Sequence, residues 1–217
     1  KFWKDDFSVD SSDQYETLSG STSTHSYDTD HIVIPSGTGI QLKHGDVAPK
    51  KFSMTVKQTD VTGSMSNGHN QFQVRFTGTP SNTIEYTAVL VRFFNSGTNN
   101  NRIWCEVLDE TGNLIMSRFH TFADTATYFA FLSSKWGFEI TFREDSKVNL
   151  SIPLLGINVT STKTVSLSGQ VRPYITTYRL KKPLEIYEIT SSPSESYADD
   201  FTTDTTERYQ PVLGTVA

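Results

Sequence analysis

The sequence predicts an all-β fold in which two antiparallel sheets pack face to face as a sandwich. Apolar and polar residues alternate with period two in about a dozen short runs, which is typical of half-buried strands. Segments rich in Ser, Thr, Asn and Gly separate these runs, and helix signals are almost absent. Short strands joined by polar turns favour a two-sheet sandwich. The one weakly helical window is 121–134.

The strands can be placed by their alternation and by the turns between them. DETG (109–112) and REDSK (143–147) each supply turn residues between two alternating runs and predict hairpins, while 94–101 is a longer polar loop. The predicted strands are 2–7, 31–35, 38–43, 51–58, 70–77, 83–94, 101–108, 113–120, 136–143, 147–154, 164–168, 171–180 and 183–190.

The phase of each strand predicts which side chains face the core. In 101–107, Ile103, Cys105 and Val107 share the inward phase, and Cys105 is expected to be a buried, inert thiol. The same argument gives Phe72, Val74, Phe76, Phe138, Ile140, Phe142, Val148, Leu150 and Ile152 as core residues.

Composition excludes several classes of protein. A net charge of -5 does not favour a nucleic-acid or anionic-membrane surface, and no apolar run is long enough for a membrane helix. A single cysteine excludes an internal disulfide and a multi-cysteine zinc site. The chain opens KFWKDDF without Met or signal peptide, so we expect a mature fragment or an excised module.

An internal repeat bears on domain organisation. DDFSVDSSDQY (5–15) returns as DDFTTDTTERY (199–209), with the Phe and Tyr in register. We interpret 1–190 as one β-sandwich module, 191–198 as a linker and 199–217 as the start of a second similar module. A chance match within a Ser/Thr/Asp-rich composition is the alternative.

The DDF opening, the hairpin WGFEITFREDSKVNLSI and the closing LEIYEIT form an order that resembles the concanavalin A-like jelly rolls. Lectins, laminin-G-like domains and many carbohydrate-binding modules share that fold. The resemblance covers residues 1 to 192 and implies that the first strand lies beside the last.

The tandem, disulfide-free, Ser/Thr/Asn-rich organisation is similar to carbohydrate-binding modules of phage tail tips, in distal tail and baseplate proteins. This likeness implies a place on a virion surface or outside a cell, and a cell-wall polysaccharide as partner. It also implies a larger multi-module, oligomeric parent protein. Nucleic-acid binding and membrane insertion are not expected, on the grounds of charge and hydropathy given above.

Catalytic patterns are incomplete. Laminarinase-like relatives of the fold carry Glu-x-Asp-x-x-Glu on one strand, but here Glu139 is followed by Thr141 where the Asp belongs. Glu185 and Glu188 are expected on opposite faces of a strand, which does not suit a glycosidase pair. The five histidines show no metal-ligand spacing, and nucleophile-elbow and P-loop motifs are absent. The chain is therefore not expected to be an enzyme.

A sugar site needs flat apolar rings for the C–H face of a pyranose and planar hydrogen-bonding groups for its hydroxyls. The outward phase of 101–107 offers this combination in Arg102, Trp104 and Glu106, with Arg92 on the preceding strand as a neighbour. Alternatively, Trp104 lies under a loop in a satellite apolar cluster.

A second stripe lies in VRPYITTYRL, where Arg172, Tyr174 and Tyr178 share one phase with Thr176. An ordinary outer strand with flat tyrosines is the alternative. Gln73 and Arg75 could complete the rim of the site. Trp3 and Trp136 begin strands and are expected in the core or as edge cover.

No cofactor is required by these residues, although jelly rolls of this kind often hold a structural calcium ion. Oxygen ligands could come from Asp28 and Asp30, or from the first acidic segment. In that segment Asp-Ser-Ser-Asp also forms an Asx-turn, the preferred interpretation. Its acidic residues are Asp5, Asp6, Asp10 and Asp13.

The sequence thus favours a non-catalytic carbohydrate-binding module that mediates adhesion to cell-surface polysaccharide. A structural or protein-interaction jelly roll of a virion or surface protein is the second interpretation. A laminarinase-like glycoside hydrolase is the third.

Overall fold

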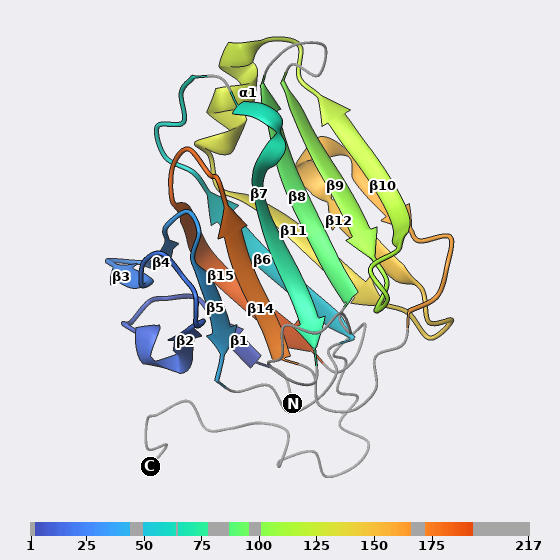
Figure 1. Ribbon diagram of the computed structural model, residues 1–217, viewed down its shortest axis with the longest axis horizontal. Helices are drawn as coiled ribbons and strands as arrows, with labels where there is room; N and C mark the ends of the chain where they lie inside the picture. The colour runs from blue at the N-terminus through green and yellow to red at the C-terminus, as the bar shows by residue number, and fades with distance from the viewer. Residues whose placement is uncertain are drawn as a thin grey trace, which may run out of the picture.

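Two antiparallel sheets stack face to face in the computed structural model, which confirms the predicted sandwich (Figure 1). The structure describes residues 3–43, 50–63, 65–77, 87–95, 101–165 and 172–192. The predicted second module, 199–217, lies outside this part of the chain, as do residues 193–198 of the predicted linker.

Within the described residues, one sheet has eight strands. Its order is β13-β12-β11-β6-β15-β4-β3, and β1 also pairs with β15. The strands are β1 (Trp3–Asp5), β3 (Ser26–Asp28), β4 (His31–Ile34), β6 (Lys51–Lys57), β11 (Trp136–Phe142), β12 (Val148–Ile152), β13 (Ile157–Thr160) and β15 (Leu184–Ser192).

The described residues form seven strands in the second sheet, in the order β10-β9-β8-β7-β14-β5-β2. The strands are β2 (Tyr15–Thr17), β5 (Gly39–Leu42), β7 (Met65–Thr77), β8 (Thr87–Asn95), β9 (Arg102–Leu108), β10 (Leu114–Thr121) and β14 (Arg172–Tyr178).

The first and last described strands lie side by side. Trp3 of β1 pairs with Ser191 of β15, as the jelly-roll resemblance implied. β15 continues to Ser192, so the strand includes the first two residues of the segment predicted as a linker.

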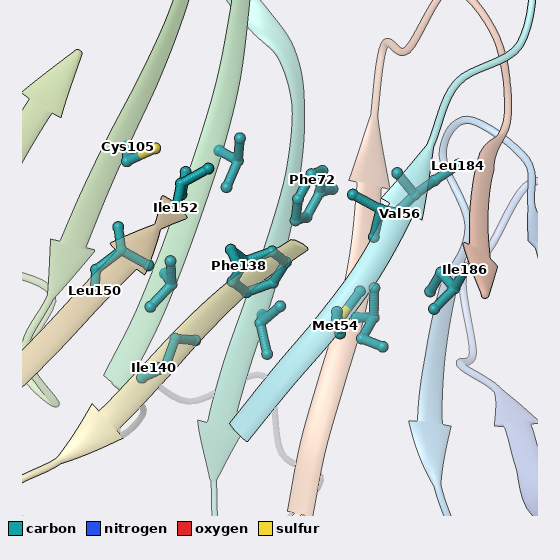
Figure 2. Packing of buried hydrophobic residues seen from close by; sticks show 14 of the residues in the cluster. Met54, Val56, Phe72, Cys105, Phe138, Ile140, Leu150, Ile152, Leu184 and Ile186 are labelled. Atoms are coloured by element: carbon teal, nitrogen blue, oxygen red, sulfur yellow. The ribbon is translucent and has the colours of Figure 1, made fainter. Parts of the chain in front are cut away.

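Apolar side chains from both sheets form one core between them. Figure 2 shows Met54, Val56, Phe138 and Ile140 of the eight-stranded sheet in the same core as Phe72 of the seven-stranded sheet, whose ring centroid is 5.7 Å from that of Phe138. All the side chains that the phase argument assigned to the core are buried, Cys105 included. Trp136 begins β11 and is buried, as expected. Trp3 begins β1, but its side chain lies outside the description.

Three strands were not predicted, namely β2, β3 and β13. Each has only three or four residues, too few for a period-two pattern to stand out. The predicted strand 164–168 does not begin as a strand, because residues 164 and 165 are outside regular structure, and its other residues are not described. Residues 83–86, which were predicted to open the next strand after β7, also lie outside the described residues.

The weakly helical window contains one helix, α1 (Thr125–Leu132). The Asp124 carboxylate caps it by accepting a hydrogen bond from the Thr127 N–H at 2.7 Å. Tyr128 and Leu132 are buried, and the helix lies at one end of the sandwich (Figure 1). Short 3-10 turns are η1 (Ser12–Gln14) and η3 (Pro153–Leu155). No helix in the described residues is long and apolar enough to cross a membrane.

Candidate functional site

The outer face of the seven-stranded sheet carries the predicted sugar-binding residues. Ile103, Cys105 and Val107 of β9 are fully buried, so the alternate residues of that strand point away from the core. Those residues are Arg102, Trp104 and Glu106, and each is partly exposed. We call this surface the polar-aromatic face. Its described side chains are Gln41, Gln71, Gln73, Arg75, Leu90, Arg92, Phe94, Arg102, Trp104, Glu106, Phe119, Tyr174, Thr176 and Tyr178.

Strand pairing places one row of these side chains across five strands. Trp104 pairs with Phe119 on one side and with Arg92 on the other. Arg92 then pairs with Gln71, and Gln71 with Tyr178. Four steps between neighbouring strands give the row a length of about 19 Å. Aromatic rings therefore lie at both ends of a row whose centre is polar.

Two further rows extend the face along the strands. In one, Glu106 pairs with Leu90, Leu90 with Gln73, and Gln73 with Thr176. In the other, Arg75 pairs with Tyr174, and Tyr174 with Gln41. The structure thus brings both predicted stripes and the predicted rim, Gln73 and Arg75, onto a single face.

Trp104 lies among side chains of adjacent strands. Its ring centroid is 5.7 Å from that of Phe94 and 5.6 Å from that of Phe119. Its Nε1–H donates to Ser117 Oγ at 2.5 Å. The indole is therefore oriented by its neighbours on the sheet surface and keeps part of its area exposed. Phe119, which is 48% exposed, was not predicted for the site; its pairing with Trp104 is the signal that could have found it.

Arg92 and Glu106 form an ion pair near the middle of the face. Arg92 Nη2 lies 2.9 Å from a Glu106 carboxylate oxygen. Glu106 is only 13% exposed, so this pair is less screened by solvent than a surface pair. The contact holds the guanidinium of Arg92, the residue that pairs with Trp104, against Glu106.

The second stripe is divided between a buried and an exposed ring. Tyr174 is 6% exposed, whereas Tyr178 is 45% exposed at the end of the row. The Arg179 guanidinium lies 5.2 Å from the centre of the Tyr178 ring. Arg172 begins β14, but its side chain lies outside the description.

The described outward carboxylates of the seven-stranded sheet are too far apart for a glycosidase pair. Among the described outward positions of this sheet, the carboxylates are Glu106 on β9 and Glu16 on the edge strand β2. Five strand spacings separate them, about 24 Å. A catalytic pair needs about 5–10 Å between its carboxyl groups.

The expected placement of Glu185 and Glu188 on opposite faces is wrong. A bulge shifts the register of β15 between Ile186 and Glu188, and both Ile186 and Ile189 are buried. Both glutamates therefore lie on the outer face of the eight-stranded sheet, because one extra residue resets the alternation. Each is held by a different lysine, Glu188 by Lys4 at 3.1 Å and Glu185 by Lys57 at 3.8 Å.

Glu185 is the centre of a polar cluster on that opposite face. It accepts hydrogen bonds from the Tyr187 hydroxyl at 2.7 Å and from the Thr59 N–H at 3.3 Å. Burial opposes ionisation, but these donors together with Lys57 hold the pKa of Glu185 below its ordinary value. His31 stacks on Tyr187 with the ring centroids 4.7 Å apart. The cluster ties β15 to its neighbours.

The first acidic segment forms a hydrogen-bonded loop. Asp10 accepts from the Ser12 N–H at 3.0 Å, which is the geometry of the preferred Asx-turn interpretation. The Asp5 carboxylate accepts from the Phe7 N–H at 2.9 Å, Ser11 Oγ at 2.6 Å and the Tyr15 hydroxyl at 2.8 Å.

In the part of the chain that the structure describes, no three His, Cys, Asp or Glu side chains are placed to hold a metal ion. This finding does not cover two of the five histidines, because His44 and the side chain of His69 are not described.

Comparison with known proteins supports the fold. No protein-family profile matches the chain, and no curated protein is similar in sequence. Solved structures do match. A glycosidic hydrolase has a TM-score of 0.59 at 12% identity, with 90% of this chain and 97% of that chain covered.

Lectin domains match over a similar length. The carbohydrate recognition domain of Emp46p has a TM-score of 0.56 at 10% identity, covering 84% of this chain and 89% of that chain. The exoplasmic/lumenal domain of VIP36, bound to Ca²⁺ and Man3GlcNAc, has a TM-score of 0.56 at 9% identity, covering 86% of each chain. Catalytic and non-catalytic proteins thus share this arrangement of strands, and the chain has the concanavalin A-like jelly-roll fold.

Proposed function

We propose that this protein is a non-catalytic carbohydrate-binding module whose polar-aromatic face holds a polysaccharide chain across the strands. The observation that carries the proposal is the row that runs from Phe119 and Trp104 through Arg92 to Tyr178. Partly exposed rings at both ends give apolar platforms for the C–H faces of sugars, and the polar groups between them suit hydroxyls. Lectin domains among the similar structures add support.

The role that we propose is adhesion to cell-surface polysaccharide, as a module of a phage tail protein that recognises its host. The support is the internal repeat of residues 5–15 at 199–209, which indicates tandem modules. A shallow sugar site binds weakly, and linked copies can raise avidity by about 10²–10⁴. We propose a virion-surface or extracellular location and a multi-module, oligomeric parent on the same grounds.

Two other functions remain as alternatives. A structural or protein-interaction jelly roll would need no saccharide at all. A glycoside hydrolase would need a carboxylate pair. The glutamates nearest one another in sequence, Glu185 and Glu188, lie on the outer face of the eight-stranded sheet, where each forms an ion pair with a lysine.

The test is binding of a fluorescent fusion of the whole chain to a glycan array and to isolated bacterial cell walls. Wild type should bind, and Trp104→Ala and Tyr178→Ala should each bind about tenfold more weakly, because each removes an aromatic contact worth about 1–1.5 kcal/mol. Leu154→Ala is the control, because Leu154 is 66% exposed in η3, away from the face. Thermal unfolding of each variant would verify that the fold is retained.

The outcomes separate the alternatives. Full binding by both aromatic variants would exclude the polar-aromatic face as the site. Absence of binding to every saccharide would favour the structural role. Release of shorter saccharides from a polysaccharide panel would establish an enzyme.

A further inference from the structure

The polar-aromatic face carries more positive charge than the protein as a whole. Its described side chains include three guanidinium groups, Arg75, Arg92 and Arg102, and one carboxylate, Glu106. The other described outward carboxylate of this sheet, Glu16, lies on the edge strand β2, outside the face. The complete chain, in contrast, has 24 acidic and 19 basic residues and a net charge of -5. A local excess of guanidinium on an acidic protein indicates a surface that favours anions.

The three arginines lie on a diagonal across adjacent strands. Arg102 on β9 pairs with Phe94 of β8, and Arg92 lies two residues from Phe94 on β8. Arg75 on β7 lies four residues from Gln71, the partner of Arg92. Strand geometry gives Cα separations of about 8 Å from Arg102 to Arg92 and about 14 Å from Arg92 to Arg75. The charges therefore form a line of about 20 Å rather than one point.

Each guanidinium group is oriented by a neighbour. Arg92 is paired with Glu106, as described above. Arg102 Nε donates to Thr121 Oγ1 at 3.1 Å, and its guanidinium carbon lies 4.6 Å from the centre of the Phe119 ring. Arg75 Nε donates to Gln73 Oε1 at 2.9 Å. Groups held in this way lose little conformational entropy when a ligand binds.

The outer face of the other sheet follows a different pattern. There, each described lysine of β6 is matched by a carboxylate, Lys51 by Glu139 at 2.7 Å and Lys57 by Glu185 at 3.8 Å. Lysine–carboxylate pairs on one face, and a line of guanidinium groups that contact Glu106, Thr121 and Gln73 on the other, distinguish the two surfaces. Arginine is the residue suited to planar, bidentate contacts with carboxylate or phosphate.

We propose that the polysaccharide bound by the polar-aromatic face is anionic, with carboxylate or phosphate groups along its chain that meet the line from Arg102 through Arg92 to Arg75. This inference rests on the proposed carbohydrate-binding function. Trp104 and Tyr178 supply contacts that any polysaccharide of pyranose units would use. The arginines then favour the polysaccharides that carry negative charge.

The experiment compares polymers that differ only in charge. Polygalacturonate and its methyl-esterified form test carboxylate, while a phosphomannan and the same mannan after dephosphorylation test phosphate. Affinity of the full chain for each polymer is measured by titration calorimetry at low and at physiological salt. We expect the chain to bind one anionic polymer about tenfold or more tightly than its neutral counterpart, with a preference that salt reduces.

Two double variants locate the preference. Arg75→Gln with Arg102→Gln should remove it, whereas Lys51→Gln with Arg143→Gln, which has the same net charge, should retain it. Lys51 and Arg143 both pair with carboxylates away from the face, Glu139 and Asp145. Arg75→Lys with Arg102→Lys keeps the charge but loses the bidentate geometry, and serves if the Gln variant does not fold.

Equal affinity for charged and neutral polymers would overturn the anionic ligand while the proposed carbohydrate binding stands. Equal loss in both Gln double variants would also overturn it, because overall charge would then explain the effect. Absence of binding to all four polymers and to the glycan array would contradict the proposed function itself.

Discussion

At the scale of single residues, Cys105 shows how burial decides reactivity. Its side chain is fully buried in β9, and desolvation raises the pKa of the thiol to about 12. At neutral pH almost no thiolate, the reactive form, is present. The alternation of IWCEV was sufficient to predict this inert thiol.

The thiol should therefore be inaccessible to reagents in the native protein. We expect a thiol-reactive dye to label the native chain only as fast as the protein unfolds, and to label it within minutes in concentrated denaturant. Quenching the labelling reaction at successive times and measuring the labelled fraction by mass spectrometry would give both rates. Rapid stoichiometric labelling at pH 7 without denaturant would contradict the buried environment.

Asp5 is a second residue whose role is structural. Its carboxylate accepts three hydrogen bonds, and Phe7, which it helps to position, is fully buried with a φ of +52°. A non-glycine residue in the left-handed region needs support from its surroundings. The clamp on Phe7 and Tyr15 supplies that support.

Removal of this clamp should destabilise the fold. Asp5→Ala removes the carboxylate that accepts from the buried Tyr15 hydroxyl, Ser11 Oγ and the Phe7 N–H, so the free energy of unfolding should fall by about 2 kcal/mol or more. Urea unfolding followed by tryptophan fluorescence would measure the change. Asp13→Ala is the matched control, because Asp13 is exposed and its side chain accepts a hydrogen bond from the amide of the neighbouring Gln14 rather than from a buried group. Equal midpoints for the two variants would show that the clamp contributes nothing.

At the scale of elements, the alternation of apolar and polar residues predicted the face of most side chains, but it could not predict a bulge. In residues 70–76 of β7 and in β9, β11 and β12 the inward phase was correct, because each of these stretches has an uninterrupted period of two over a buried face. The bulge in β15 escaped prediction, since one inserted residue, Tyr187, leaves no mark in composition. The consequence was the wrong face for Glu188 relative to Glu185.

The site was predictable only in part for a related physical reason. Phase along β9 and β14 assigns Trp104 and Tyr178 to an outer surface, but it cannot say that they share a row. That arrangement depends on the pairing of β9 with β8, β8 with β7 and β7 with β14, which join residues far apart in the chain. Phe119 was missed for another reason: the β9–β10 hairpin has a register shift between Leu114 and Met116, which places Phe119 rather than Arg118 opposite Trp104.

The polar cluster on β15 gives a pH-dependent prediction. Because the pKa of Glu185 is lower in the folded state than its ordinary value of 4.5, its stabilising effect is present above that value. The effect is lost as pH falls through the folded pKa. Wild type should thus exceed Glu185→Gln in free energy of unfolding by about 2 kcal/mol at pH 7, and the difference should shrink below pH 4.

Denaturant titrations at several pH values would follow this difference. Glu188→Gln is the control, because Glu188 is 39% exposed in its pair with Lys4 and should change stability little at any pH. A Glu185→Gln deficit that is constant from pH 7 to pH 3 would mean that ionisation of this carboxyl does not matter.

At the scale of the whole molecule, the internal repeat acquires a physical meaning. Asp5, Phe7, Ser11 and Tyr15 are the residues whose side chains form the first clamp, and the second copy has Asp, Phe, Thr and Tyr at 199, 201, 205 and 209. Three of these contact-making positions are identical in the two copies and the fourth is a Ser/Thr exchange, which favours the tandem-module interpretation over a chance match. The place beside the 189–191 end of β15 is already taken by β1.

It follows that residues from 199 onward should not be needed by the first sandwich. A chain that ends at residue 198 should unfold at the same urea midpoint and with the same m-value as the full chain, because the m-value reports the surface exposed on unfolding. It should also keep its affinity for any saccharide that the full chain binds. A chain that ends at residue 180 is the matched control: it lacks β15, which pairs with β1, β4 and β6, and should not fold. If ending the chain at residue 198 lowers the midpoint, the second copy stabilises the first sandwich and the tandem-module interpretation is wrong.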